Sequence, residues 1–454
     1  MQNGDVMDTD RELEPGSCDT MVALGGATSN NQTIFAKNSD RPGNECQPLL
    51  LRERRDHLQG GETNCQFVSF PEVGATYRHV GSQPYWCWGY EHGFNEHQVV
   101  IGNEALGSKL DSAIEGRLIG MELLRLGLER GRTAAEATEV MTDLISQHGQ
   151  GKFDNDADVR TYDNGYIIAD PKEAYVLETA GHEWAVKNVE GAIGISNVYS
   201  VQNDATRLSS GAESVARSHG WVESEEFNFA DAYSRSERQK SSGAMRRGRS
   251  CALLGQRTGE IDAKTMMAIL SDHSNGENPG EEFRESIGSP PSICVHTNED
   301  GTGGNTAASL VADLCDDGFR LPVYWCSMYS PCLGVFLPVF VEGRVPEILS
   351  VGSGEQDEES PWWLFHKLTR LARERPEERI PIVREKWKFL QEQLFGSAYV
   401  VAREGMDLVR GGSASEAGSM LSDYMAENVT SMLDDLRMVL TEIEGKPEKV
   451  SMPV

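Results

Sequence analysis

The chain has 454 residues, with 42 basic and 71 acidic side chains, so its formal net charge is −29. Proteins that bind nucleic acid or an anionic membrane surface need a basic face to displace counterions, and this balance therefore disfavours both kinds of partner. A hydrophobic content of 39% is enough for a sizeable core. The sequence has no apolar run of about 18 or more residues, so no membrane span is predicted.

The first 17 residues form an acidic leader that lacks the apolar segment of a secretory signal and is not rich in arginine. We therefore expect a cytoplasmic protein whose nine cysteines stay reduced. No CxxC pair is present, which argues against a zinc ribbon or a thioredoxin-like site. Cys294 and His296 stand two residues apart, but two residues do not make a zinc site. We predict a core thiol and a hydrogen-bonded histidine there, and no metal.

The first predicted elements follow the leader. "CDTMVALGG" and "TIFAKNSD" have the composition of two short strands, and the polar turn "ATSNNQ" between them indicates a hairpin. "EHQVVIGNEA", residues 96–105, predicts a further strand. The next segment, residues 111–130, has apolar residues at helical spacing and predicts a helix. These residues are Ile114, Leu118, Met121, Leu124 and Leu128.

A second helix is predicted over residues 133–149, where Thr133 and Glu136 form a capping box and Gly149 ends the helix. Three strands should follow, "NGYIIAD", "EAYVLETAG" and "HEWAVKNV". Runs of strands and runs of helices favour an α+β fold with antiparallel sheets over alternating β-α-β units.

The rest of the chain is predicted to be helical and loop-rich. A helix is expected near residues 262–273, and polar loops over 274–291 and 298–305. Residues 350–360 have the composition of an acidic linker. Beyond it, residues 361–454 are predicted to form packing helices, interrupted by "GGSASEAGS", and not a separate catalytic domain.

Cys18 lies where the leader ends and the first predicted strand begins. A cysteine needs a base to remove its proton before it can act as a nucleophile, and no histidine is close in sequence. Cleavage between Ser17 and Cys18 would free an α-amine with a reference pKa of about 7.7–8.0, suited to general-base work near neutral pH. The alternative is a small residue that opens a strand, and Cys18 alone favours that alternative.

Several segments together resemble one family. They are "CDTMVAL", "IFAKNSDR", "WGYEHGFNEHQVVIGNEA", "GMELLRLGLERGRTAAEA", "ADPKEAYVLETAGHEWAVK", "GISNVYS" and "FNFADAYS". From Cys18 to about Phe340 the chain resembles the secernins, in peptidase family C69 of the N-terminal-nucleophile (Ntn) hydrolases. The resemblance implies a four-layer α-β-β-α sandwich with antiparallel sheets. Together with the composition of the C-terminal part, it divides the chain into a removable leader (1–17), the hydrolase domain (18–349), the linker (350–360) and a helical extension that packs on the core (361–454).

The resemblance also implies roles for individual residues. Cys18 corresponds to the nucleophile and Asp40 to the acid that holds the amine and thiol in place. Asn95 and Asn197 correspond to amide donors for the oxyanion, and Arg246 to a supporting arginine, although the tandem with Arg247 leaves the register open. Each residue could instead have an ordinary structural role. Asp40 could cap a turn, Asn95 could occupy a turn, Asn197 could start a loop and Arg246 could be a surface charge. Where the family usually has glycine, this chain has Gln98.

These matches imply a cysteine-type amide hydrolase, with dipeptidase activity as the family-level expectation and no cofactor. The substrate would be a small peptide or another linear amide. One alternative is a catalytically silent regulator with a protein partner in secretion, since a fold can persist without its chemistry. Another is an acylase for a lipid-like amide. A homo-oligomer also remains open.

Overall fold

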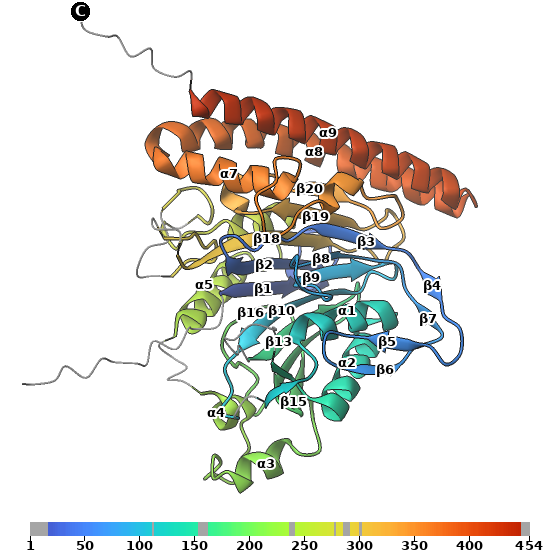
Figure 1. Ribbon diagram of the computed structural model, residues 1–454, viewed down its shortest axis with the longest axis vertical. Helices are drawn as coiled ribbons and strands as arrows, with labels where there is room; N and C mark the ends of the chain where they lie inside the picture. The colour runs from blue at the N-terminus through green and yellow to red at the C-terminus, as the bar shows by residue number, and fades with distance from the viewer. Residues whose placement is uncertain are drawn as a thin grey trace, which may run out of the picture.

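The computed structural model describes residues 17–110, 113–152, 162–235, 241–276, 278–284, 291–298 and 302–445. The predicted leader, apart from Ser17, lies outside these residues. Two antiparallel sheets stacked face to face form the centre of the molecule, and helices cover both outer faces (Figure 1). None of the described helices combines the length and apolar composition needed to cross a bilayer.

The first sheet has six strands and contains the N-terminal hairpin. Its strands, in spatial order, are β16 (Ala192–Ser196), β1 (Cys18–Ala23), β2 (Ile34–Pro42), β18 (Gly304–Asp313), β19 (Val323–Met328) and β20 (Leu337–Val339). Every neighbouring pair is antiparallel. All six side chains of β1 are buried, because the sheet is covered on both faces. The predicted β1–β2 hairpin is confirmed.

The second sheet has eight antiparallel strands and includes the three strands predicted in succession. In spatial order they are β17 (Arg207–Leu208), β15 (Glu183–Asn188), β14 (Ala174–Ala180), β13 (Asp163–Ala169), β10 (Val100–Leu106), β9 (His92–Asn95), β8 (His79–Ser82) and β3 (Leu49–Arg52). Three small two-stranded ribbons complete the described strands: β4 (Arg55–Asp56) with β7 (Ala75–Thr76), β5 (Glu62–Asn64) with β6 (Ser69–Pro71), and β11 (Ala113–Gly116) with β12 (Gly151–Lys152).

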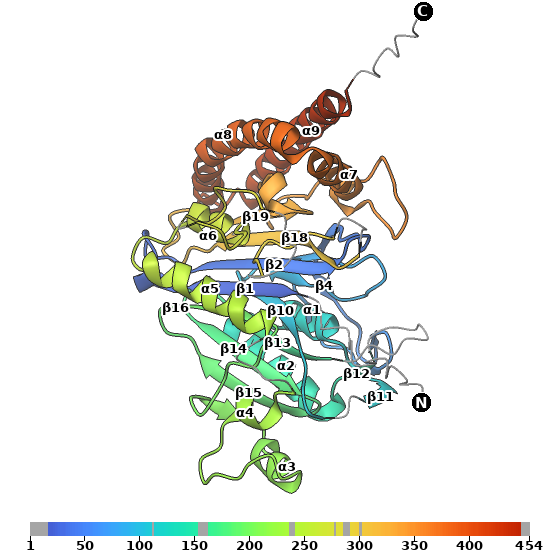
Figure 2. The same cartoon turned by 90° about the vertical axis from the view of Figure 1, so that its left-hand side faces the viewer.

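Helices form the two outer layers (Figure 2). On the eight-stranded sheet lie α1 (Gly120–Arg130) and α2 (Ala134–His148), and on the six-stranded sheet lie α5 (Ser242–Gln256) and α6 (Ala263–Leu270). The C-terminal helices α7 (Pro361–Glu374), α8 (Pro376–Arg410) and α9 (Ala414–Glu444) pack over β19 and β20. Shorter helices are α3 (Ala212–Ser218), α4 (Phe229–Tyr233), η1 (Gly25–Ala27), η3 (Pro331–Leu333) and η4 (Glu347–Ser350). The predicted four-layer α+β architecture with C-terminal helices is confirmed.

Local sequence signals explain where the two adjacent helices begin. Thr133 caps α2 as predicted, because its hydroxyl accepts from the Glu136 amide at 3.1 Å. The helix predicted from residue 111 instead begins at Gly120, after the short strand β11. There the Glu122 carboxylate accepts from the Ile119 amide at 3.1 Å and satisfies one unpaired donor of the first turn. The apolar residues at helical spacing before Gly120 therefore do not belong to a helix.

Candidate active site

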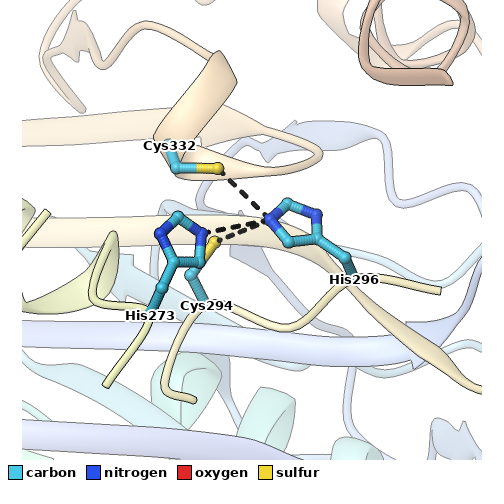
Figure 3. A group of neighbouring side chains, drawn as sticks. All are labelled: His273, Cys294, His296 and Cys332. Atoms are coloured by element: carbon cyan, nitrogen blue, oxygen red, sulfur yellow. Dashed lines mark hydrogen bonds between the residues drawn. The ribbon is translucent and has the colours of Figure 1, made fainter. Parts of the chain in front are cut away.

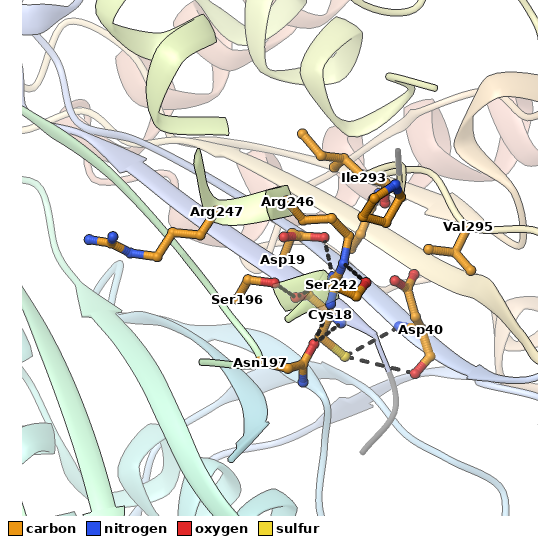
Figure 4. A network of polar contacts seen from close by, with 12 residues as sticks. Cys18, Asp19, Asp40, Ser196, Asn197, Ser242, Arg246, Arg247, Ile293 and Val295 are labelled. Carbon is orange, nitrogen blue, oxygen red and sulfur yellow. Dashed lines mark hydrogen bonds and ion pairs between the residues drawn. The ribbon is translucent and has the colours of Figure 1, made fainter. Parts of the chain in front are cut away.

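The site is organised by the position of Cys18 at the start of β1. Strand β1 runs between β2 and β16, and Cys18 lies opposite Ser39 while the next residue lies opposite Ser196. Asp40 and Asn197 each follow one of these partners in sequence. The pairing therefore gathers Cys18, Asp40 and Asn197 at one end of the sheet (Figure 4).

Asp40 contacts the thiol through its main chain. Its backbone N–H donates to Cys18 Sγ at 3.4 Å, and its carbonyl oxygen lies 3.8 Å from the same sulfur. Its carboxylate is turned elsewhere: Oδ1 accepts from the Thr306 hydroxyl at 2.6 Å. The other oxygen, Oδ2, is buried and has no hydrogen-bond partner within the described part of the chain. Thr306 is thus a site residue that the sequence analysis missed.

Asn197 joins Cys18 to Arg246. Its Oδ1 accepts from the Cys18 backbone nitrogen at 2.7 Å and from Arg246 Nη2 at 2.8 Å. Its Nδ2 carries two hydrogens, one of which is donated to the Ala105 carbonyl at 2.9 Å. The orientation of the Asn197 side chain is therefore fixed before any substrate binds. Its Oδ1 and its Nδ2 are both held by partners from distant parts of the chain.

Arg246 resolves the ambiguous tandem of arginines. Its Nη1 donates to the Cys18 carbonyl at 3.1 Å and to Asp19 Oδ2 at 2.7 Å, and it is 2% exposed. Arg247 points away from this network (Figure 4). Asp19 is a second residue that the sequence analysis missed. An acidic residue inside a strand that was expected to be buried was the available signal, since buried charges are nearly always paired.

A glycine allows the helix that carries Arg246 to approach the site. Gly243 lies in the first turn of α5, and a Cβ atom there would stand 2.8–2.9 Å from the backbone oxygen and carbon of Asn197. Such contacts are shorter than carbon and oxygen atoms tolerate. The absence of a side chain at Gly243 therefore brings α5 close enough for Arg246 to reach both Asn197 and Cys18.

Burial decides the protonation state of the thiol. It raises the pKa of Cys18 to about 12, and the nearby positive charge of Lys37 only partly opposes that effect. Burial likewise raises the pKa of Asp40 to about 8, with Arg246 as the main opposing charge. Lys37 is fully buried and its Nζ lies 3.5 Å from Glu104 Oε1. At neutral pH the thiol is therefore protonated, and its chemistry requires a base.

Asn95 has a different role from the one the resemblance implied. Its Nδ2 donates both hydrogens to main-chain carbonyls, those of Leu128 at 2.9 Å and Gly131 at 2.8 Å. Its Oδ1 accepts from the backbone N–H groups of His97 and Val99. No amide hydrogen is left for an oxyanion. We therefore correct the assignment: Asn95 fixes the turn between β9 and β10 and ties it to the end of α1.

The same turn accommodates Gln98 at a position where the family usually has glycine. Gln98 has φ of 63°, a left-handed conformation that costs energy for a residue with a side chain. Its side chain compensates by a two-way contact with the backbone of Cys315, with both hydrogen bonds at 2.9 Å. Gln98 therefore keeps the turn conformation and links the turn to the segment after β18.

Comparisons with known proteins identify the family of the chain. Residues 18–262, more than half of the chain, match the family described as peptidase family C69. Two crystal structures of variants of a conjugated bile acid hydrolase from Clostridium perfringens are similar, at 12% and 11% identity, covering 68% of this chain and 89% of theirs, with TM-scores of 0.40 and 0.38. A Caenorhabditis elegans ortholog of N-acylethanolamine-hydrolyzing acid amidase has 13% identity, coverage of 65% and 92%, and a TM-score of 0.32.

The close approach of α5 yields a stability prediction with an internal control. Gly243→Ala should lower the free energy of unfolding by about 1–3 kcal/mol, because the added methyl group overlaps the backbone of Asn197. Gly248→Ala lies in the same helix, where a Cβ would meet nothing within 4 Å. It should raise the free energy of unfolding by about 0.5–1 kcal/mol. Urea unfolding measures both, and equal effects would contradict the packing described here.

Proposed function

The chain belongs to peptidase family C69, and from this premise we propose that it is a cysteine-type amide hydrolase of the Ntn class, acting as a dipeptidase. The family implies a peptide substrate. The observation that carries the proposal is the environment of one residue: the Cys18 nitrogen lies 2.7 Å from Asn197 Oδ1, and its sulfur lies 3.4 Å from the Asp40 amide. Both reactive atoms of a terminal nucleophile thus have polar partners.

Removal of the leader supplies the missing base. While Ser17 remains attached, the Cys18 nitrogen is an amide whose lone pair is delocalised and cannot accept a proton. Hydrolysis of the Ser17–Cys18 bond turns it into an amine, and in this position Asn197 Oδ1 accepts one of its hydrogens and directs the lone pair. The amine then takes the thiol proton as the sulfur attacks the substrate carbonyl.

The tetrahedral intermediate needs a donor for its negative oxygen. We assign this role to the second Nδ2 hydrogen of Asn197, whose side chain is fixed by Arg246 and the Ala105 carbonyl. Fixed donors of this kind lower the barrier because they need no reorganisation during the reaction. Arg246 is a positioning residue in this scheme, because its contacts are to Asn197, Asp19 and the Cys18 carbonyl.

The remaining steps conserve atoms and protons. Collapse of the intermediate breaks the carbon–nitrogen bond of the substrate, and the α-ammonium of Cys18 gives its proton to the departing amine. A thioester on Cys18 remains. Water then attacks the thioester carbonyl, with the α-amine again accepting a proton, and the carboxylic acid leaves while the thiol is restored. The scheme uses groups of this chain and water alone.

A secernin-like regulator of secretion, catalytically silent, is the second candidate. The observation that favours it is the buried thiol, which is 5% exposed and whose pKa burial raises to about 12. In that state Cys18 is a poor nucleophile, and the protein would act by binding a partner. A cytoplasmic location is part of both proposals. An acylase for lipid-like amides would differ from the dipeptidase only in its substrate.

The two candidates differ in the fate of the leader. We expect wild-type protein to begin at Cys18, because the Cys18 sulfur attacks the Ser17 carbonyl and water hydrolyses the resulting thioester. Cys18→Ala should retain its leader and hydrolyse no peptide. Intact mass and N-terminal sequencing measure this. Cleavage of the variant at the wild-type rate would show that a separate protease removes the leader.

A shortened chain separates processing from catalysis. Expression from Met followed directly by Cys18 leaves a terminal amine once methionine aminopeptidase has acted. We expect this form to hydrolyse dipeptides. If it is folded, begins at Cys18 and hydrolyses neither dipeptides nor N-acyl amides, the hydrolase proposal is overturned and the binding role gains support.

The pH profile should report the amine and not the thiol. The pKa of Cys18 in the uncut chain is about 12, raised by burial, so the sulfur alone would give activity rising only toward that pH. With the amine as base, activity requires the unprotonated amine and should rise with pH through about 7.7–8.0. Measurement of kcat/KM from pH 5 to 10 distinguishes control by the amine from control by the thiol. A value of kcat/KM that still increases tenfold per pH unit at pH 10 would exclude the amine as the base.

The two asparagines should respond differently to substitution. Asn197→Ala should lower kcat by about 10²–10³-fold, as loss of one oxyanion donor does elsewhere. Asn95→Ala should instead lower the free energy of unfolding by about 2–4 kcal/mol, since it leaves buried backbone groups unpaired. Its kcat per folded molecule should stay within a few-fold of wild type. Titration of folded sites with a thiol reagent normalises the rates, and the reverse pattern would restore Asn95 to the oxyanion site.

A further inference from the structure

A second group of reactive side chains lies outside the active site. His273 follows α6, Cys294 and His296 belong to the segment 291–298 before β18, and Cys332 lies in η3 (Figure 3). All four are buried, and their nitrogen and sulfur ligand atoms lie within 4.8 Å of one another. The sequence showed only the pair Cys294 and His296. The fold adds one histidine and one cysteine from segments 21 and 36 residues away from that pair.

The three distances that meet at His296 Nε2 match a tetrahedral metal site. Zinc–nitrogen bonds of about 2.0–2.1 Å and zinc–sulfur bonds of about 2.3 Å place two nitrogens about 3.3–3.4 Å apart and a nitrogen and a sulfur about 3.5–3.6 Å apart. The two Nε2 atoms of His273 and His296 are 3.2 Å apart. His296 Nε2 lies 3.7 Å from Cys294 Sγ and 3.3 Å from Cys332 Sγ. Each separation is within about 0.3 Å of the tetrahedral value.

The outer nitrogens of both rings are already engaged. His273 Nδ1 lies 3.0 Å from the Glu282 carbonyl oxygen, which can only accept a hydrogen bond. Its Nδ1 therefore carries the proton, and Nε2 presents a lone pair to the cluster. His296 Nδ1 lies 3.3 Å from the Ser330 hydroxyl. Metal-binding histidines characteristically have the outer nitrogen fixed in this way, because it sets the tautomer and the ring orientation.

A cation explains this convergence better than hydrogen bonds do. Three groups meet at His296 Nε2, and a single ring nitrogen offers either one hydrogen or one lone pair. Hydrogen bonding can therefore satisfy only one of the three contacts well. A metal ion bound among the four ligand atoms replaces all three of these contacts with metal–ligand bonds. Two thiolates and two neutral imidazoles balance a 2+ charge, so the filled site adds no net charge to the interior.

We propose that His273, Cys294, His296 and Cys332 bind one Zn²⁺ ion as a structural site. The ligand set, two soft sulfurs and two imidazoles in tetrahedral arrangement, is the one that selects zinc. Four protein ligands leave no open position for water or substrate, so the ion holds chain segments together and takes no part in hydrolysis. It joins the end of α6, the segment 291–298 and η3.

The proposed ion also stabilises the support of the active site. Val295 lies between two of the ligands, and its N–H donates to the Thr306 hydroxyl at 3.0 Å while its carbonyl accepts from the Thr306 amide at 2.9 Å. That same hydroxyl donates to Asp40 Oδ1. Ile293 accepts from the Asn38 side chain at 3.0 Å. Val295 and Asp40, both labelled in Figure 4, thus share the Thr306 hydroxyl as a hydrogen-bond partner. Fixing this segment therefore fixes the side chain of Asp40.

Metal analysis of the full-length protein tests the proposal directly. The protein is produced without a polyhistidine tag, and its metals are counted by mass spectrometry. We expect about one zinc per folded chain in wild type and less than a tenth of that in Cys294→Ser and Cys332→Ser. Cys326→Ser is the matched control, a buried cysteine in β19 outside the cluster, and should keep its zinc. Replacement of zinc by Co²⁺ should give the visible bands of a tetrahedral cobalt–thiolate site.

A measurement on wild type covers the case in which the variants do not fold. A mercurial reagent that modifies thiols should release the zinc, detected with a chromogenic indicator, and chelation should lower the Tm until zinc is restored. Folded wild-type protein without stoichiometric zinc would overturn the proposal. Zinc that remains bound in the double variant Cys294→Ser/Cys332→Ser would also overturn the proposal. An intact mass of wild type that shows these two sulfurs joined in a disulfide would do the same. None of these readouts depends on hydrolase activity.

Discussion

The register of β1 between its two neighbours is the constraint on which the candidate site depends. Cys18 pairs with Ser39 on one side, and Asp19 pairs with Ser196 on the other. A slip of one residue would turn every side chain of β1 to the opposite face of the sheet. The sulfur would then leave the Asp40 backbone, and Asp19 would leave Arg246. Because both faces of β1 are buried, such a slip would also disrupt the packing between the two sheets.

The site concentrates charge in the interior, and its stability therefore depends on pairing. Arg246 is buried between Asp19, at 2.7 Å, and the more distant charge of Asp40. Burial still raises the pKa of both carboxyls, that of Asp40 to about 8. For a carboxyl, a raised pKa means that the folded state holds its proton more tightly than the unfolded chain does. Ionisation of Asp40 thus opposes folding increasingly from the unfolded pKa of about 4 up to pH 8. Such a cost is typical of residues retained for chemistry.

The candidate active site and the cysteine–histidine cluster share one supporting segment. Residues 291–298 supply two members of the cluster and also the backbone groups that hold Thr306, the hydrogen-bond partner of Asp40. Helix α5 supports the opposite side of Cys18, where Gly243 permits its contact with Asn197. Cys18 is therefore fixed from two directions by segments that follow it by more than 200 residues. Neither support belongs to the strand that carries the sulfur.

The sequence by itself determined what depends on near neighbours. Strand-like composition and turn residues predicted the β1–β2 hairpin and the three strands from β13 to β15, and the Thr133 cap located the start of α2. Resemblance added Cys18, Asp40, Asn197 and Arg246, which the structure brings together. The predicted start of α1 was wrong, because apolar spacing alone does not distinguish a helix from a short strand followed by a loop. Only the tertiary structure decided which polar groups meet. Asn95 donates both of its amide hydrogens to backbone carbonyls at the end of α1. His273 and Cys332 join the pair of Cys294 and His296, which the sequence left incomplete. Cys18 and Asn197 are 179 residues apart. Contacts at such separations follow from sheet pairing and helix packing, which no local pattern of residues encodes.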